Sequence, residues 1–556
     1  FHYTVPEPLF LPPVVIYGGF ASGFALGEAG GRTAENCHNV GSAPHSSMSI
    51  YAAIDIGSNS IRLAVADTES GRFYKLLAAE RQVTRIGEGV FTSGRVAEKA
   101  IEETCAVLAR FAATCQKWQP VAIRAVATSA IRDASNQAEF LARASKAAGV
   151  QIQVISGREE ARLIHLGVLA RWPKPDPEML VLDIGGGSAE VIWSQSGEIR
   201  YSKSLPLGAV RLTESFLQHD PPAEEELAEL HEYIQQQFAG TLRRLGRCAK
   251  ARAIGTSATA AAAVCAVNRI RSSDREEAAG RRARYREIQA LYRRLIRMDC
   301  RDRQRIPGIG PRRAEIIIPG VAVLQSFVEH FTGGAIYYSP AGLRDGLIAD
   351  LAARRVTSEA ASLDRQQRRT VMEMARRYGV SLPHARQVAT LARSLFLNLA
   401  SAHRLPLSYA RLLEAAAYLH DVGHYVSSIR HHKHSYYLVA NSDMPGFTDR
   451  EQLIVANICR YHRKALPSDE HDHFRTLKPD ERRAVALLVP LLRVADGLDR
   501  GHRQLVTSVE AEAQEGRICV FVKWRPGIEL DLWAARRAAP SFGQVYRSEL
   551  VISSQR

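Results

Sequence analysis

Two stretches of the chain repeat one pattern of apolar and polar positions. Each begins with an apolar run of β-strand type, at residues 51–54 and 179–182. Each then passes through an acidic residue and several small residues into a second strand-like segment, at residues 61–65 and 189–193. Because alternation with a period of two is typical of strands, both stretches are predicted to be β-hairpins with small-residue turns.

The remaining periodicity predicts an α/β region followed by a mainly helical one. Strands are expected at 80–89, 121–126 and 151–155, and helices at 96–115, 260–267 and 284–298. Beyond a polar linker at 357–368, amphipathic helices are expected at 369–378, 384–399 and 408–420. The tail is predicted to form strands at Arg517–Trp524 and 544–552 around a helix at 530–538.

These segments divide the chain into four folded parts: an α/β lobe at 48–175, a second at 176–352, an all-α domain at 365–503 and a small α+β module at 504–556. Residues 1–47 precede the first methionine, Met48, and are rich in Pro, Gly and Ala without a period. They are expected to be a disordered extension or upstream translation.

The turns of the two hairpins have the composition of a phosphate-binding loop. They read Asp55-Ile56-Gly57-Ser58-Asn59-Ser60 and Asp183-Ile184-Gly185-Gly186-Gly187-Ser188. Small residues let backbone N–H groups approach an anion closely, and an acidic residue at the strand end can hold a cation that bridges phosphate oxygens. One such turn usually closes only a hairpin. Two copies roughly 130 residues apart indicate two similar lobes facing one cleft.

This repeat resembles the actin, Hsp70 and sugar-kinase superfamily, and the two turns resemble those of the exopolyphosphatase and guanosine pentaphosphate phosphatase family. Further segments resemble the family's ordered motifs: Arg85-Ile86-Gly87-Glu88-Gly89, the segment 127–133, Ile306-Pro307-Gly308 and the segment 339–346. The resemblance extends from Met48 to about Leu351. It implies hydrolysis of terminal phosphoanhydride bonds, on polyphosphate or on the 5′-γ-phosphate of guanosine pentaphosphate.

Two adjacent glutamates begin the segment after residue 155. Ser156 and Glu159 have the spacing of a capping box, in which Ser bonds the N3 amide and Glu reaches back to the N-cap amide. By its position alone, Glu160 would be a surface carboxylate that complements the helix dipole. The resemblance implies instead that Glu160 is the catalytic general base.

The expected reaction assigns roles to the other residues of the turns. The amides of Gly57 to Ser60 and of Gly185 to Ser188 are expected to bind the terminal phosphates. Asp55 and Asp183 are expected to hold Mg²⁺ (or Mn²⁺), and Glu190 is expected to point toward the cleft as a further residue of the phosphate-binding set. Arg85 is a candidate phosphate clamp because its guanidinium fork fits phosphate oxygens.

The helical part carries a separate set of metal-ligand residues. His384, the adjacent pair His420-Asp421 and the distant Asp496 resemble the HD phosphohydrolase domain, which implies one divalent metal ion on this set. Five histidines between them could serve a second ion: His424, His431, His432, His434 and His462. Relatives of the phosphatase often use a similar domain for architecture or dimerisation only, and a homodimer is expected.

Composition adds charge to this picture. The net charge is +15 with 24% charged residues, which favours polyanionic partners or reflects solvated surface arginines. Eight cysteines without a Cys-x-x-Cys pair indicate neither a zinc ribbon nor a disulfide framework. These cysteines fit a reducing cytosol, so a cytoplasmic protein is expected. No apolar run has the length of a membrane span, so no stable membrane insertion is expected. The expected partners are polyphosphate or the alarmone and not nucleic acid. A non-catalytic sensor of the same ligands is the alternative of another class, and a sugar-type kinase ranks last because no segment resembles a sugar site.

Overall fold

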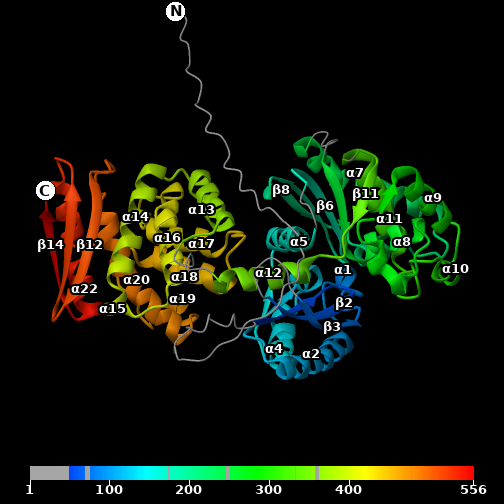
Figure 1. Ribbon diagram of the computed structural model, residues 1–556, viewed down its shortest axis with the longest axis horizontal. Helices are drawn as coiled ribbons and strands as arrows, with labels where there is room; N and C mark the ends of the chain where they lie inside the picture. The colour runs from blue at the N-terminus through cyan, green and yellow to red at the C-terminus, as the bar shows by residue number, and fades with distance from the viewer. Residues whose placement is uncertain are drawn as a thin grey trace, which may run out of the picture. The chain divides into compact units, whose positions relative to one another are not determined.

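The computed structural model describes residues 49–68, 75–172, 176–245, 251–331, 333–356 and 362–555 (Figure 1). The predicted extension at 1–47 and the first part of the predicted linker, 357–361, lie outside the described residues. Within the described residues, no helix is long and apolar enough to cross a membrane.

The first lobe is built on a five-stranded sheet with the strand order β3-β2-β1-β4-β5. Its strands are β1 (Ile50–Ile56), β2 (Ser60–Asp67), β3 (Lys75–Val83), β4 (Ala122–Ala127) and β5 (Ile152–Val154). β1 pairs antiparallel with β2 and parallel with β4, which confirms the first predicted hairpin. Helices α2 (Glu98–Trp118) and α4 (Gln137–Ala148) cover one face through an apolar core that includes Phe111 and Phe140.

The second lobe repeats this arrangement. Its sheet has the order β10-β11-β9-β6-β7-β8, with β6 (Glu178–Ile184), β7 (Ala189–Gln195), β8 (Glu198–Leu205), β9 (Arg252–Thr256), β10 (Arg282–Arg284) and β11 (Ala335–Tyr338). The predicted second hairpin is confirmed as the antiparallel pair β6–β7, and β6 pairs parallel with β9. The core beside this sheet is formed with helices α7 (Glu224–Leu245), α8 (Ser257–Val267), α9 (Tyr285–Leu295) and α11 (Ile317–Phe331).

Two helices cross between the sheets, and each packs against the sheet of the other lobe. Helix α5 (Gly157–Arg171), which the chain reaches before lobe II, packs Ala161, Ile164 and Val168 against β6 and β7. Helix α12 (Leu343–Val356), which follows lobe II, packs on β1 and β2 of lobe I, on the face opposite α2 and α4 (Figure 1). Near the predicted boundaries at residues 175 and 352, the lobe to which a helix belongs in the chain order is therefore not the lobe against whose sheet it packs.

Short helices complete the lobes: α1 (Val90–Ser93), α3 (Ser129–Asp133), α6 (Ala209–Phe216) and α10 (Cys300–Gln304). The helical domain consists of α13 (Arg365–Arg377), α14 (Leu382–Asn398), α15 (Ala400–His403), α16 (Tyr409–Leu419), α17 (His431–Ala440), α18 (Asp449–Tyr461), α19 (Asp472–Arg475) and α20 (Pro479–Gly497).

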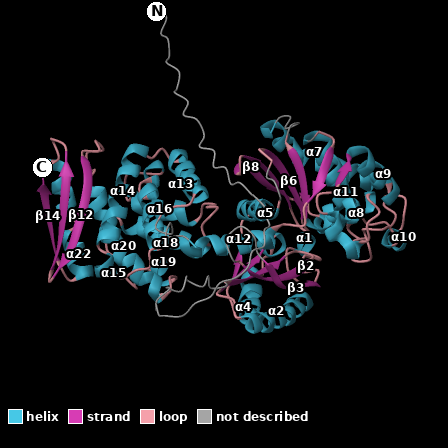
Figure 2. Ribbon diagram, in the orientation of Figure 1, coloured by secondary structure: helices cyan, strands magenta, loops and turns pink. Residues whose placement is uncertain are grey.

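The tail forms a three-stranded sheet of β12 (Val506–Gln514), β13 (Arg517–Trp524) and β14 (Glu549–Gln555), with helices α21 (Glu529–Arg536) and α22 (Ala539–Tyr546) (Figure 2). The predicted strand at Arg517–Trp524 is confirmed. The prediction of a strand from residue 544 is wrong at its start, because 544–546 end α22, where Phe542 and Tyr546 stack. Helical domain and tail share one apolar core.

Candidate functional site

The two small-residue turns face each other across one cleft. Both turns close with the same backbone bond, Gly57 N to Ser60 O at 3.2 Å and Gly185 N to Ser188 O at 2.9 Å. A Cβ built on Gly186 would lie 2.8 Å from the Cβ of Ser58, so only glycine fits where the second turn approaches the first. The structure thus brings together the two loops that the sequence singled out.

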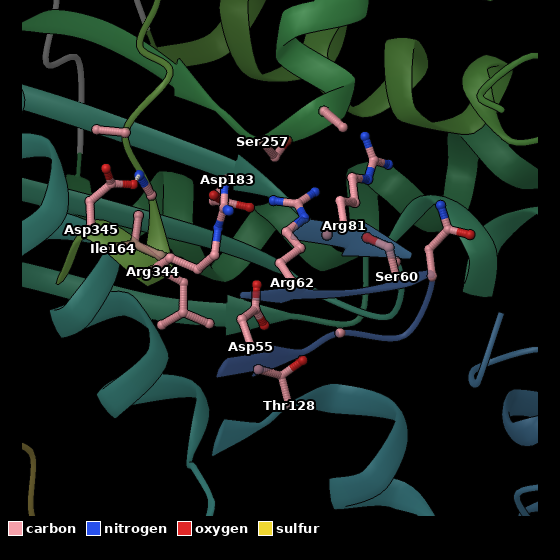
Figure 3. A pocket seen from close by; sticks show the side chains of 18 of the residues that line it. Asp55, Ser60, Arg62, Arg81, Thr128, Ile164, Asp183, Ser257, Arg344 and Asp345 are labelled. Atoms are coloured by element: carbon pink, nitrogen blue, oxygen red, sulfur yellow. Dashed lines mark hydrogen bonds between the residues drawn. The ribbon is translucent and has the colours of Figure 1, made fainter. Parts of the chain in front are cut away.

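The turns line a cavity of about 320 Å³. Its walls contain Asp55, Gly57, Ser58, Asn59, Ser60, Glu160, Asp183, Gly185, Gly186, Gly187 and Ser188, each of which the sequence nominated. Asp55 and Asp183 end β1 and β6, and with Arg62 they point into the same space (Figure 3). All nominated phosphate-binding turn residues therefore lie at one site with both aspartates and Glu160.

The acidic side of the cavity is crowded and buried. Burial raises the pKa of Asp55 despite Arg62 and Arg344, and burial raises the pKa of Asp183 despite a hydrogen bond from Thr256. Burial, followed by repulsion from Glu190, raises the pKa of Glu160 well above 4.5. A cation placed among these buried carboxylates would stabilise their ionised forms.

Glu160 is positioned by the start of α5. Ser156 is the N-cap, and its Oγ accepts from the amide of Glu159 at 3.2 Å. Arg132 donates to the carbonyl of Ile155 at 2.7 Å and to Glu160 Oε2 at 3.3 Å, which orients the carboxylate. Glu160 is 7% exposed, so the surface-carboxylate interpretation does not hold.

The capping-box prediction is half right. Ser156 caps the helix as predicted, but the Glu159 carboxylate does not reach back to it. It accepts from Arg162 at 2.8 and 2.9 Å, from Arg124 at 3.2 Å and from the amide of Gly446 at 3.0 Å. A buried pair of guanidiniums is a stronger partner for the carboxylate than one amide.

Glu190 lies behind the cavity wall. It is the cross-strand partner of Asp183 and is 1% exposed, and its Oε1 accepts from Ser204 Oγ at 2.7 Å. Burial, together with repulsion from Asp183, raises the pKa of Glu190 to about 7. Glu190 therefore acts on the cavity through its charge beside Asp183 and Glu160.

Arginines that sequence reasoning missed form the basic side of the cavity, and they lie close to its carboxylates: Arg62 acts on the pKa of both Asp55 and Asp183. Arg62, Arg81, Arg313 and Arg344 line it. Arg62 and Arg81 are cross-strand partners on β2 and β3, a proximity that no local pattern reveals. Burial and then the charge of Arg62 lower the pKa of Arg81 to about 9 and that of Arg313 to about 10.

Several buried donors of the residues that line the cavity have no hydrogen-bond partner among the described residues. The Oγ of Ser58, the Nε of Arg81 and the Nε of Arg313 are buried and make no hydrogen bond. Buried polar groups are nearly always satisfied, because leaving a donor unpaired costs about 1–3 kcal/mol. These three donors are therefore unsatisfied groups of residues that line the cavity.

The structure places Arg85 away from this set. Its side chain is 51% exposed and pairs with Glu315 of the second lobe at 2.8 Å. Arg85 is not among the described residues that line the cavity. The phosphate-clamp interpretation therefore has no geometric support at Arg85, whereas Arg81 and Arg313 line the cavity.

The helical domain brings its nominated ligands together in a second place. The Nε2 atoms of His384 and His420 lie 3.4 and 3.5 Å from Asp496 Oδ1. Both Nε2 atoms are buried and have no hydrogen-bond partner in the part of the chain that the structure describes, and the two rings with Asp496 form a group that can hold a metal ion. The donor set of two imidazoles and a carboxylate fits a divalent transition metal.

Asp421 lies between this group and a second one. Its Oδ2 is 3.6 Å from His420 Nε2, whereas its Oδ1 faces His424 and His431 at 3.5 and 3.6 Å. His462 joins the second group, at 3.9 Å from Asp421 Oδ1. Among the described residues, the metal-ligand groups do not include His432 or His434, which were nominated with them.

Comparison with known proteins places the chain in one family. The sequence pattern of the Ppx/GppA phosphatase family matches residues 64–355, more than half of the chain, and that of Ppx/GppA phosphatase domain III matches residues 366–524. A solved Ppx/GppA protein from Aquifex aeolicus is 29% identical, covers 56% of this chain and all of its own length, and has a TM-score of 0.50.

Two further solved structures agree. An exopolyphosphatase-like protein is 27% identical and covers 56% of this chain and 99% of its own, with a TM-score of 0.52. An exopolyphosphatase from Cytophaga hutchinsonii is 26% identical and covers 55% of this chain and 98% of its own, with a TM-score of 0.51. The shared fold is the two-lobed actin-like fold that the repeated hairpins predicted.

Proposed function

The chain belongs to the Ppx/GppA phosphatase family, and on this premise we propose that it is an exopolyphosphatase, which hydrolyses the terminal phosphoanhydride bond of inorganic polyphosphate and releases orthophosphate. One observation carries the proposal: the two small-residue turns, the arginines Arg81 and Arg313, and Glu160 line one cavity. The cavity can therefore accommodate a phosphate anion next to Glu160, the proposed base.

The cavity brings carboxylates and guanidiniums close together, which suits a polyanion with a bound cation. The acidic side would hold Mg²⁺ through Asp55 and Asp183, directly or through water, and the ion would neutralise phosphate oxygens as charge develops. The basic side would bind further phosphates of the chain. Neighbouring arginines lower the pKa of Arg81, and neighbouring carboxylates raise the pKa of Glu160. Phosphate oxygens bound near the arginines and a cation bound near the carboxylates would relieve this repulsion between like charges.

Glu160 is the group that acts on water in this scheme. Its raised pKa makes it a stronger base than an ordinary glutamate, and Arg132 holds one carboxylate oxygen. The other oxygen is left to orient the attacking water and to accept its proton. The turn amides of Gly57 to Ser60 and Gly185 to Ser188 bind the terminal phosphates, so the reaction needs no covalent intermediate on the protein.

In the helical domain, His384, His420 and Asp496, with Asp421 beside them, would bind one divalent ion. The unpaired buried Nε2 atoms of both histidines support this assignment. This ion is separate from the cleft, and the hydrolysis of polyphosphate does not depend on it.

The proposal is tested by phosphate release from long-chain polyphosphate and from guanosine pentaphosphate at matched concentration, for Arg81→Met and Arg85→Met. Arg81 would supply a charged hydrogen bond worth about 1.5–3 kcal/mol, so Arg81→Met should lower kcat/KM for polyphosphate roughly 10- to 150-fold. Arg85→Met is the matched control. It removes only an exposed ion pair worth at most about 1 kcal/mol.

Three results would contradict the proposal. If Arg81→Met and Arg85→Met lowered kcat/KM equally, Arg81 would not be assigned as a phosphate-binding residue of the cavity. Faster conversion of guanosine pentaphosphate than of polyphosphate would make the alarmone the substrate. Tight polyphosphate binding by wild-type protein without phosphate release would make the chain a sensor.

A further inference from the structure

A loop of the helical domain contacts the first turn of α5, the turn that carries the proposed base. The loop joins α17 to α18 and comprises residues 441–448. Its Asp443 Oδ1 accepts a hydrogen bond from Ser156 Oγ. Its Gly446 amide donates to Glu159 Oε2 at 3.0 Å in a buried contact. The first turn of α5 is therefore bonded to a domain whose contact residues lie 287 positions further along the chain.

The 441–448 loop is itself held within the helical domain. Gln367 Nε2 of α13 donates to the carbonyl of Gly446 at 2.8 Å, and this bond is buried. Thr370 Oγ1 of the same helix donates to the carbonyl of Pro445, also at 2.8 Å and buried. Met444 is 3% exposed and belongs to the apolar core of the domain. Because α13 and the core both hold the loop, it can support the turn of α5 as a rigid element.

Ser156 makes two hydrogen bonds that depend on the rotation of one hydroxyl group. Its Oγ accepts from the amide of Glu159 at 3.2 Å, which is the N-cap bond, and it donates to Asp443. The hydroxyl presents a lone pair to the amide only while its hydrogen points elsewhere. The carboxylate of Asp443 is the acceptor for this hydrogen. Asp443 therefore stabilises the N-cap bond and, with it, the geometry of the first turn.

The cap determines where the backbone of Glu160 lies. The amide of Glu160 donates to the carbonyl of Ser156 at 2.9 Å, so these residues begin and end one helical turn. A misplacement of about 1 Å can lower a catalysed rate about 10²-fold, so a change at the cap affects the base. The contact between Gly446 and Glu159 has a different effect. It docks the loop without directing Glu160, because two buried arginines also hold the Glu159 carboxylate.

We propose that Asp443 is a positioning residue for the reaction in the cleft: it holds the Ser156 cap so that Glu160 faces the attacking water. The inference rests on the proposed function, because it takes Glu160 as the base. It makes the docking of the helical domain a requirement for turnover between the lobes. The side chain of Asp443 is 33% exposed, so its replacement leaves no cavity in a core.

The test measures phosphate release from polyphosphate by the full chain with Asp443→Ala or Asp443→Asn. Asp443→Ala should lower kcat about 5- to 100-fold and change KM less than about threefold, because the phosphate-binding turns are untouched. Asp443→Asn loses the charge that faces Arg158 at 3.6 Å. Its kcat should nevertheless stay within about threefold of wild type, because the amide oxygen still accepts from Ser156.

Asp472→Ala is the matched control. It removes a carboxylate of the same domain whose side chain is 89% exposed, and it should have the kcat of wild type. A double-mutant cycle identifies the route: in a chain with Ser156→Ala, a further Asp443→Ala should change kcat less than about twofold, because the bond is already absent. Unchanged kcat in Asp443→Ala, equal losses in Asp443→Ala and Asp443→Asn, or independent effects in the cycle overturn the proposal.

Hydrogen–deuterium exchange of α5, measured without substrate, separates this proposal from the function of the cleft. The amide of Glu160 should exchange faster in Asp443→Ala than in wild type or Asp443→Asn, because a weakened cap lets the first turn open. Thermal unfolding of each variant distinguishes this local opening from a loss of fold. Faster exchange without turnover in any protein, wild type included, would refute the exopolyphosphatase and support the link through Ser156. Normal turnover with equal exchange in all three proteins would refute the positioning role.

Discussion

Glu160→Gln separates the chemistry of the cleft from its structure, because it removes one charge and almost no volume. A general base typically contributes about 10²–10⁴ in rate, so kcat for polyphosphate should fall by that factor, equivalent to about 3–5 kcal/mol of transition-state free energy. KM should change less than about threefold, because the amide leaves the turns, Arg81 and Arg313 in place. Steady-state phosphate release with saturating Mg²⁺ measures both constants.

The same substitution should stabilise the metal-free protein. The pKa of Glu160 is raised well above 4.5, so its stabilising contribution is complete below that pH and is lost as pH rises through the folded-state pKa. Glutamine carries no charge near Glu190, so the difference in melting temperature between variant and wild type should grow with pH. Thermal unfolding in chelator from about pH 5 to 9 measures it.

Its neighbour Glu159 is the matched control, one residue along the same helix. Glu159 is 6% exposed and pairs with Arg162 and Arg124. Breaking a buried ion pair costs about 3–5 kcal/mol, so Glu159→Gln should lower stability while kcat of the folded fraction stays within about threefold. A large kcat loss in Glu159→Gln with none in Glu160→Gln would refute the assignment.

Three further predictions concern the same cleft. Ser58→Ala should lower kcat/KM for polyphosphate about 10-fold or more without lowering the melting temperature, because Ser58 Oγ has no hydrogen-bond partner among the described residues; an unchanged kcat/KM would contradict it. Glu190→Gln should shift the acid limb of the kcat profile to lower pH, because the charge of Glu190 raises the pKa of Glu160 and the base must be deprotonated to act; pH-rate profiles measure the shift. Gly187→Ala should reduce activity at least 10-fold in the same assay, since its Cβ would overlap Phe91 of the other lobe.

The sequence predicted the hairpins and their meeting because both depend on local pattern and on repetition. A strand of alternating residues with a small-residue turn determines its own pairing, and a second copy implies a matching lobe. Asp55 and Asp183 could therefore be assigned from their positions in the repeat. The exchange of α5 and α12 between lobes could not, because apolar periodicity shows which face of a helix is buried and not which sheet buries it.

The basic side of the cavity was missed for a similar reason. Arg62 and Arg81 each look like an ordinary polar position of a strand, and only the register of β2 with β3 makes them neighbours. Arg85 was nominated from its motif, but its partner Glu315 lies in the other lobe, far along the chain. The resemblance to the HD phosphohydrolase domain groups Asp421 with one ion, whereas its two oxygens face different histidines.

The crossing of α5 and α12 has a consequence for substrate entry. A Cβ at Gly167 would overlap the carbonyl of Gly342, and one at Gly346 would overlap that of Leu163, so the helices touch main chain to main chain. Where two helices meet without interdigitated side chains, they can slide past each other by small amounts, and such shear motions can close a cleft between two lobes. A single added methyl, as in Gly346→Ala, would push the helices apart. Because each helix is attached to the opposite sheet, that push would widen the cleft from both walls at once.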